Sequence, residues 1–186
     1  MNEVIAAIRP LVDALEHLGL TYRVGGSVAS SFHGVGRSTM DIDLNVNLEL
    51  QHVPMLVQAL QGVYYADGEL ITQALEHKQS FNLIHLESYI KIDIFPLLSG
   101  SFDQASFERV HIDENTNYLT PEDTILRKLE WYRLSNGSER QWRDVLGIIQ
   151  EQHRVLDYEY LRHWAMEIGV QDLLENIILE SQKNIL

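Results

Sequence analysis

Two segments of the chain alternate polar and apolar residues, and this pattern constrains the fold more than any other feature. Residues 40–46 carry aliphatic side chains at every second position, with Asp41 and Asp43 between them. Residues 90–95 repeat the pattern with a single aspartate, Asp93. Successive side chains of a β-strand point to opposite faces. Both segments are therefore predicted strands that bury an aliphatic face and present three carboxylates on the other.

The three carboxylates raise the hypothesis of a metal site. Like charges held close together repel one another unless a cation joins them. Carboxylate oxygens on rigid strands suit Mg²⁺, which takes one or two of them and completes its shell with water and substrate phosphates. The alternative is a solvated strand face, because Asp-x-Asp is common on exposed strands. The preceding Gly25-Gly26-Ser27 turn, the short helix after it and the later Asp93 strand together favour the metal site.

Length and composition narrow the class of protein. The chain has 186 residues, of which 45% are hydrophobic, enough for one sizeable domain with a small helical extension. No run approaches the roughly 18 consecutive apolar residues of a membrane span. The chain contains no cysteine, which excludes disulfides and thiolate metal sites. The first residues lack the basic and apolar regions of a signal peptide, so a cytoplasmic location is expected.

The formal net charge of −13 disfavours indiscriminate binding of long nucleic acids, because phosphate contacts require clustered lysine and arginine. One basic cluster interrupts the acidic chain, and it is predicted to attract a triphosphate or to hold the end of a tRNA. The cluster consists of Arg127, Lys128, Arg133, Arg140 and Arg143.

Periodicity and turn residues predict the other elements. In the first part we expect helices over residues 4–18, 27–33, 53–60, 68–76 and 101–107, and strands over 21–24, 40–46, 81–85, 89–95 and 108–112. From Thr120 onward the chain is predicted to be helical, over residues 121–134, 139–153, 158–168 and 171–183. Ser27, Asp67, Thr120 and Asp157 are the predicted helix caps.

These elements predict an α/β (α+β) fold in which a mixed twisted sheet is flanked by helices and followed by a C-terminal helical bundle. The composition changes near residue 115. We therefore predict an α/β core over residues 1–115 and a helical region over residues 116–186.

The run from Gly25-Gly26-Ser27 to Arg37-Ser38-Thr39-Met40-Asp41-Ile42-Asp43, with Lys91-Ile92-Asp93 later, resembles the nucleotidyltransferase superfamily of the polymerase-β type. Within this superfamily, the residue pattern of the motif is similar to that of the bacterial AbiEii-type nucleotidyltransferases. The segments around Lys128 and Asp144 also resemble those proteins. The resemblance covers roughly residues 20–150.

The resemblance implies the nucleotidyltransferase fold, with a nucleotide bound between the sheet and the helical part. Asp41, Asp43 and Asp93 would be the catalytic residues and would hold two Mg²⁺ ions, with Asp93 taking the proton of the acceptor hydroxyl. The implied nucleotide-binding residues are Gly25, Gly26, Ser27, Arg37, Lys128 and Asp144. Lys128 would neutralise the triphosphate, and Asp144 would orient Lys128 or contact the nucleotide.

Residue-level alternatives remain at several of these positions. Lys128 lies off the apolar stripe of its helix and could be solvated. Arg140 and Asp144 are four residues apart and could form only a surface ion pair. His33 is predicted to be a local hydrogen-bond partner rather than a base. The three tryptophans, Trp131, Trp142 and Trp164, are predicted to belong to the core rather than to stack on a base.

The function predicted from the sequence is Mg²⁺-dependent transfer of a nucleoside monophosphate from an NTP to an acceptor hydroxyl of a protein, a tRNA or a small molecule. The resemblance implies toxin–antitoxin or phage-defence biology, with a possible cognate toxin or antitoxin partner and no membrane. One alternative is a catalytically silent nucleotide-binding antitoxin or sensor module. Another is an enzyme of the antibiotic-modifying kind, whose cationic substrate an acidic protein would suit.

Overall fold

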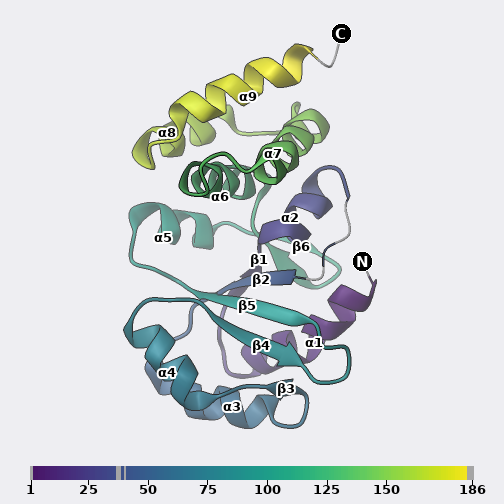
Figure 1. Ribbon diagram of the computed structural model, residues 1–186, viewed down its shortest axis with the longest axis vertical. Coiled ribbons are helices and arrows are strands. Elements are labelled where there is room, and N and C mark those ends of the chain that lie inside the picture. Colours follow the sequence, from purple (N-terminus) through teal and green to yellow (C-terminus); the bar gives the residue numbers. More distant parts are fainter. Residues whose placement is uncertain (1, 37–38, 40, 184–186) are drawn as a thin grey trace.

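The computed structural model describes residues 2–36, 39 and 41–183, and Figure 1 shows a central sheet with helices on both faces. Helices α6 to α9 lie above the sheet in this view, α3 and α4 lie toward the bottom of the molecule, and α1 lies at the level of β4 and β5. The helices are α1 Asn2–His17, α2 Gly26–His33, α3 Val53–Leu60, α4 Gly68–Glu76, α5 Ser101–Glu108, α6 Pro121–Leu134, α7 Glu139–Gln152, α8 Tyr158–Glu167 and α9 Gln171–Lys183, with a 3₁₀ turn, η1, over Leu50–His52. None of these described helices is long and apolar enough to span a bilayer.

Within the described residues the sheet has seven strands in the order β3-β4-β5-β2-β1-β7-β6. The strands are β1 Tyr22–Val24, β2 Asp41–Val46, β3 Tyr64–Tyr65, β4 Phe81–His85, β5 Lys91–Pro96, β6 His111–Asp113 and β7 Thr116–Tyr118. The pairs β2–β5 and β1–β7 are parallel and the other pairs are antiparallel. The predicted mixed sheet flanked by helices is therefore confirmed, and β4 and β5 form an antiparallel hairpin within it.

Two hydrophobic clusters stabilise the chain on either side of the sheet. The first joins the aliphatic face of the sheet, including Ile42 and Ile92, to Leu11 of α1 and Leu56 of α3. The second lies among α6 to α9 and is centred on fully buried residues such as Leu129. Burying these side chains removes apolar area from water at about 25 cal/mol per Å², which is the main favourable term in folding.

The helix caps explain where several elements begin. The side chain of Thr120 accepts a hydrogen bond from the Asp123 amide, and Asp67 and Asp157 cap α4 and α8 in the same way, as predicted. The predicted cap at Ser27 is wrong. Gly25 is the N-cap of α2 and forms no side-chain cap bond, so Ser27 already lies within the helix.

Two short strands were not expected from the sequence. β3 has two residues and β7 has three, and neither segment carries the apolar run by which longer strands are recognised. β7 pairs with β1 and β6, so the sheet continues to Tyr118, beyond residue 115. Residues 116–118 were assigned to the helical region in the sequence-based division.

A buried polar network connects the start of α6 to α8. The carboxylate of Asp123 is fully buried and accepts hydrogen bonds from the hydroxyls of Thr120 and Tyr160, at 2.5 and 2.7 Å. Arg109 lies over the Tyr160 ring, at 3.8 Å from its centroid, and donates a hydrogen bond to Glu122. Burial raises the pKa of Asp123 from 3.8 to about 6, although the two hydroxyls and Arg109 lower it.

This raised pKa makes the stability of the chain depend on pH. A carboxyl group whose pKa is higher in the folded state stabilises that state below its unfolded pKa, near 3.8, and loses this contribution as the pH rises through about 6. The contribution that is lost amounts to about 3 kcal/mol of unfolding free energy, because each unit of pKa difference between the folded and unfolded states is worth about 1.4 kcal/mol. We expect Asp123→Asn to remove most of this slope when unfolding free energies are measured between pH 3 and 7. An unchanged slope in the variant would show that other groups titrate.

Candidate active site

The register of β2 and β5 brings the predicted aspartates together. In this parallel pair Asp43 stands opposite Asp93, and Asp41 stands opposite Lys91. Ile42 and Leu44 are completely buried on the other face. The alternation in the sequence therefore places Asp41, Asp43 and Asp93 on one face of the sheet, toward the helices above it.

Asp43 lies against the N-terminal end of α2. Gly26 has a φ of +55°, and a Cβ built on it would lie 1.5 Å from Oδ2 of Asp43, so this position requires glycine. Burial raises the pKa of Asp43, and the charges of Asp93 and Asp41 raise it further. Lys128 and a hydrogen bond from the Ser27 backbone lower it. The ionised form of Asp43 is thus disfavoured unless positive charge is nearby.

Lys91 supplies part of that positive charge. Its ammonium lies 2.9 Å from Oδ2 of Asp93, and the Asp93 side chain is only 18% exposed. The hydrogen bond to Asp93 raises the pKa of Lys91, and all three aspartates add to this effect. Lys91 was not among the site residues predicted from the sequence. The signal was present, because Lys91 lies two residues before Asp93 on a strand and both side chains therefore point to the same face.

The residues fit a divalent cation by the chemistry of their donor groups. They offer carboxylate oxygens from adjacent strands, and the repulsion among them would be relieved by a cation. Within the residues that the structure describes, however, no three His, Cys, Asp or Glu side chains are grouped closely enough to hold a metal ion. The Asp93 carboxylate is instead paired with Lys91.

Lys128 is buried and not solvated, contrary to the alternative raised by the sequence. It is 4% exposed, and its ammonium donates to Asp144 Oδ2 at 2.7 Å and to Gln141 Oε1 at 3.0 Å. Asp144 also accepts a hydrogen bond from the Ser30 hydroxyl on α2 at 3.3 Å. The Lys128–Asp144 pair therefore links α6, α7 and α2 above the strands that carry the aspartates. The bonds from Lys128 to Asp144 and Gln141 fix the position of the lysine side chain.

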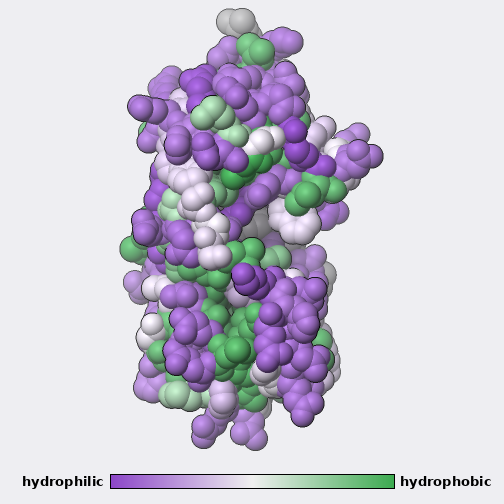
Figure 2. Space-filling model, turned by 90° about the vertical axis from the view of Figure 1, so that its left-hand side faces the viewer, coloured by the Kyte–Doolittle hydropathy of each residue, from purple (hydrophilic) through white to green (hydrophobic). Residues whose placement is uncertain are grey.

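A pocket of about 510 Å³ lies between the sheet and helices α5 and α6. The surface of this side of the molecule shows hydrophobic residues between hydrophilic ones (Figure 2). The residues that line the pocket include Gly26, Ser27, Asp43, Lys78, Phe95, Leu97, Leu98, Phe107, Thr124, Arg127, Lys128, Trp131 and Leu134. Of the predicted site residues, the pocket thus joins Gly26, Ser27, Asp43 and Lys128 to an apolar, partly aromatic region, whereas Gly25, Asp41, Asp93 and Asp144 are not among its lining residues. Such a combination is typical of small-molecule sites.

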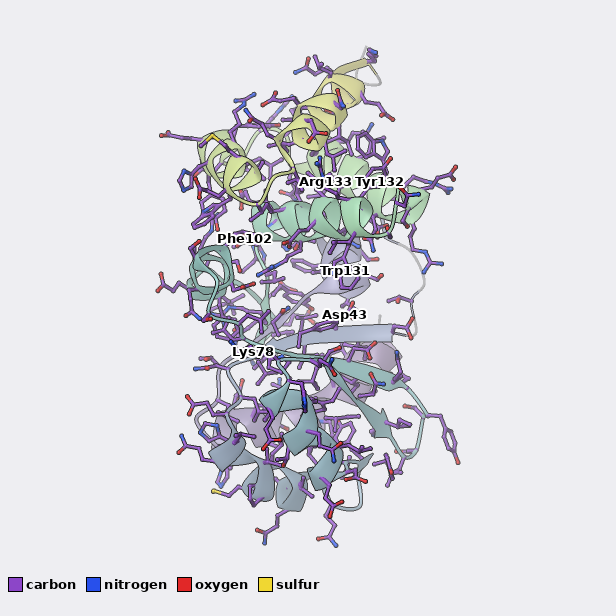
Figure 3. All side chains as sticks on the ribbon, turned by 60° about the vertical axis from the view of Figure 1, so that its left-hand side comes forward. Asp43, Lys78, Phe102, Trp131, Tyr132 and Arg133 are labelled. Carbon is purple, nitrogen blue, oxygen red and sulfur yellow. The ribbon has the colours of Figure 1, made fainter. Side chains whose placement is uncertain are left out.

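Trp131 corrects an expectation from the sequence. Its side chain does not belong to the core: it is 52% exposed and lines the pocket. Figure 3 shows it on the side of α6 that faces β2, with Asp43 and Lys78 across the gap. Trp142 and Trp164 do pack against the helical core, as expected.

The basic cluster is largely neutralised by acidic side chains. Arg127 pairs with Asp103 and Glu130, Arg133 with Asp172, and Arg143 with Glu139. Sequence spacing could not show the pairs of Arg127 with Asp103 and of Arg133 with Asp172, because these two partners lie on other helices. Only Arg127 and Lys128 of this cluster line the pocket. Arg37, the other predicted cation, lies outside the described residues.

His33 behaves as the sequence predicts. It is 3% exposed, and its Nε2 lies 2.7 Å from the carbonyl oxygen of Leu119. Burial lowers its pKa from 6.5 to about 4, so the ring is neutral near pH 7. A neutral, enclosed imidazole that holds the chain after β7 has a structural role.

No protein-family model and no curated protein sequence matches the chain. Solved structures do match by shape. The antibiotic-resistance factor ANT(2'')-Ia, a nucleotidyltransferase, is 12% identical with a TM-score of 0.56 over 97% of this chain and 95% of its own. A nucleotidyltransferase-like protein from Paracoccidioides brasiliensis is 14% identical with a TM-score of 0.53 over 80% and 76%. The chain therefore has the nucleotidyltransferase fold.

Proposed function

We propose that this chain is a Mg²⁺-dependent nucleotidyltransferase that moves a nucleoside monophosphate from an NTP to an acceptor hydroxyl. The observation that carries the proposal is the register of Asp43 opposite Asp93. Of this pair, Asp43 lies against Gly26 at the start of α2 and lines a pocket that Lys128 also lines. The fold shared with nucleotidyltransferases supports it.

We propose a separate chemical role for each of these residues in the reaction. The acceptor oxygen forms a bond to the α-phosphorus of the NTP, the bond from that phosphorus to the bridging oxygen breaks, and pyrophosphate leaves. Asp93 would accept the proton of the acceptor hydroxyl. Bound Mg²⁺, held by Asp41, Asp43 and Asp93, would neutralise phosphate charge as it develops. Lys128, fixed by Asp144, would face the same phosphates.

The backbone at the start of α2 would contribute to phosphate binding. Amides at a helix N-terminus attract anions. Gly25 follows β1 as the N-cap of α2, and Gly26 lets the backbone approach Asp43 closely. Here the carboxylate of Asp43 occupies the vicinity of these amides, so a phosphate would share the site with Asp43 and a cation. Arg37 stays a proposed nucleotide-binding residue on the strength of the sequence resemblance.

The acceptor remains a choice among a protein side chain, a tRNA end and a small molecule. The net charge of −13 favours a protein or a small cationic molecule over a long nucleic acid. The resemblance to AbiEii-type proteins adds the proposal of toxin–antitoxin or phage-defence biology, in the cytoplasm and with a cognate partner protein.

A second candidate is a silent nucleotide-binding module that acts as an antitoxin or sensor. One observation favours it: the carboxylate of Asp93, the proposed base, is paired with Lys91. In an active enzyme this pair would have to separate, or to share Asp93 with the substrate.

Incubation with α-labelled NTPs, Mg²⁺ and panels of protein, tRNA and small-molecule acceptors tests both candidates. Transfer of label with release of pyrophosphate supports the enzyme. Binding of NTP measured by calorimetry, without label transfer to any acceptor, supports the silent module. Absence of NTP binding contradicts both.

Trp131 offers a test of where the nucleotide base binds. Stacking of a base on an aromatic side chain contributes about 1–3 kcal/mol. We expect Trp131→Ala to weaken NTP binding about tenfold or more in calorimetric titrations, with little change in melting temperature because the side chain is 52% exposed. Met166→Ala, which removes an equally exposed apolar side chain from α8, is the control. Equal NTP affinity of both variants and the wild type would contradict this placement.

A further inference from the structure

Lys78 follows the C-cap of α4, His77, and has a backbone conformation that lysine rarely adopts. Its φ is +54°, in the left-handed region. The Lys78 amide donates to the Leu75 carbonyl at 3.1 Å, and the next amide, of Gln79, donates to the Ala74 carbonyl at 2.8 Å. This is the position after a helix at which glycine is usual, because a Cβ is strained there. Lysine at this position therefore makes the fold less stable than glycine would. The presence of a lysine side chain here is thus not explained by folding.

The Lys78 side chain lines the pocket from the sheet side. The other two cations of the lining, Arg127 and Lys128, come from α6 on the opposite wall. Figure 3 shows Lys78 below the gap and Trp131 above it. Lys78 thus places a positive charge where α6 cannot.

The charge of Lys78 is also available to a ligand. Arg127 is paired with Asp103 and Glu130, and Lys128 with Asp144. Lys78 is exposed, and among the described residues its ammonium forms no ion pair or hydrogen bond. An anion that enters this pocket would therefore gain more from Lys78 than from cations that carboxylates already neutralise.

We propose that Lys78 binds the phosphate chain of the nucleotide, as a substrate-binding residue that approaches from the sheet side. The inference rests on the proposed function, since it takes the ligand to be a polyphosphate. A polyphosphate carries several negative charges close together, and the acidic side chains of Asp43, Asp103 and Glu130 also line the pocket. Asp103 and Glu130 are paired with Arg127, so the ammonium of Lys78 is the lining charge that would offset the repulsion between the phosphates and Asp43. A strained lysine that favours binding at a cost to folding is a compromise that is common at functional sites.

Four variants separate the charge of Lys78 from its backbone conformation. Lys78→Met keeps the strained backbone and the aliphatic stem but removes the charge. Lys78→Arg restores the charge. Lys78→Gly removes both strain and charge. Tyr89→Gly is the matched control, because Tyr89 has a φ of +57°, is 80% exposed and does not line the pocket.

Calorimetric titrations with ATP, GTP, CTP and UTP in Mg²⁺ buffer, and with the monophosphate and nucleoside of the tightest binder, provide the test. We expect Lys78→Met to weaken triphosphate binding about tenfold and to leave nucleoside binding unchanged, as loss of one charge-assisted hydrogen bond implies. Lys78→Arg should bind within about threefold of the wild type. Lys78→Gly should melt about 2 °C higher and still bind weakly, whereas Tyr89→Gly should melt higher and bind normally.

Two results would overturn the inference. One is a triphosphate affinity of Lys78→Met within about twofold of the wild type. The other is an equal loss for nucleoside and triphosphate, which would place Lys78 at the base. Titration with inorganic tripolyphosphate keeps this inference separate from the proposed function. If wild type binds tripolyphosphate more tightly than Lys78→Met but binds no NTP, Lys78 binds phosphate and the proposed function fails.

Discussion

Asp43→Asn is expected to reduce nucleotidyl transfer by more than about 100-fold and to raise the melting temperature at pH 7. Loss of an outer-shell partner of a metal already reduces activity about 10- to 100-fold, and Asp43 is proposed to bind the cation directly. The stabilisation follows from the raised pKa of the buried Asp43 carboxyl. Such a group stabilises the fold below its unfolded pKa and loses this contribution as the pH rises through the folded one. Asparagine avoids that loss.

The measurements are the initial rate of label transfer at saturating NTP and a thermal melt at pH 7. Asp13→Asn is the control, since it changes an exposed aspartate of α1 that pairs only with Arg9 among the described side chains. It should change neither quantity appreciably. Transfer by Asp43→Asn within about threefold of the wild type would rule out a role in binding the cation. A lower melting temperature would instead show that its bond to the Ser27 backbone outweighs the burial of its charge.

Asp144→Ala is expected to have the largest effect on stability. The Lys128–Asp144 pair is almost completely buried, with side-chain exposures of 6% and 7%. Removing one partner of a buried pair leaves an uncompensated charge, which costs about 3 kcal/mol or more. For a domain of this length we expect the melting temperature to fall by about 10 °C. NTP binding should weaken as well, because Lys128 loses the carboxylate that orients it.

The double variant Asp144→Ala, Lys128→Met separates the two effects. Removing both charges should recover much of the stability, because no unpaired charge remains, whereas NTP binding should stay weak. The control is Asp172→Ala, which breaks the exposed pair with Arg133 and should cost less than about 1 kcal/mol. If Asp144→Ala is no more destabilising than this control, the buried pair contributes little to the fold.

The strands and long helices could be predicted from the sequence because local patterns determine them. The alternation around Asp43 and Asp93 assigns their faces without knowledge of the fold, and Thr120 followed by proline marks the start of α6. The two- and three-residue strands β3 and β7 carry no such pattern. They form because β4 and β1 offer partners, which is a tertiary effect.

The candidate site was predictable where chemistry is encoded in residue type and parity, and not where burial decides the outcome. Lys128 is polar and off the apolar stripe, yet α7 covers it and Asp144 neutralises it. Trp131 resembles a core residue in its spacing, but no helix covers the face of α6 on which it lies. Lys78 could not be identified from the sequence. Its proposed role follows from its backbone angle and from its place in the pocket, and neither is visible in a sequence pattern.

The parallel register of β2 and β5 has a consequence for how this chain tolerates insertions and deletions. The same pairing that buries Ile42 and Ile92 aligns Asp43 with Asp93. A deletion of one residue within β5 would rotate Asp93 into the hydrophobic layer and Ile92 or Ile94 into the pocket. Selection for a packed core alone would therefore preserve the alignment of the carboxylates. Length variation in descendants of this sequence should collect in the turn over residues 86–88 and spare the strand itself.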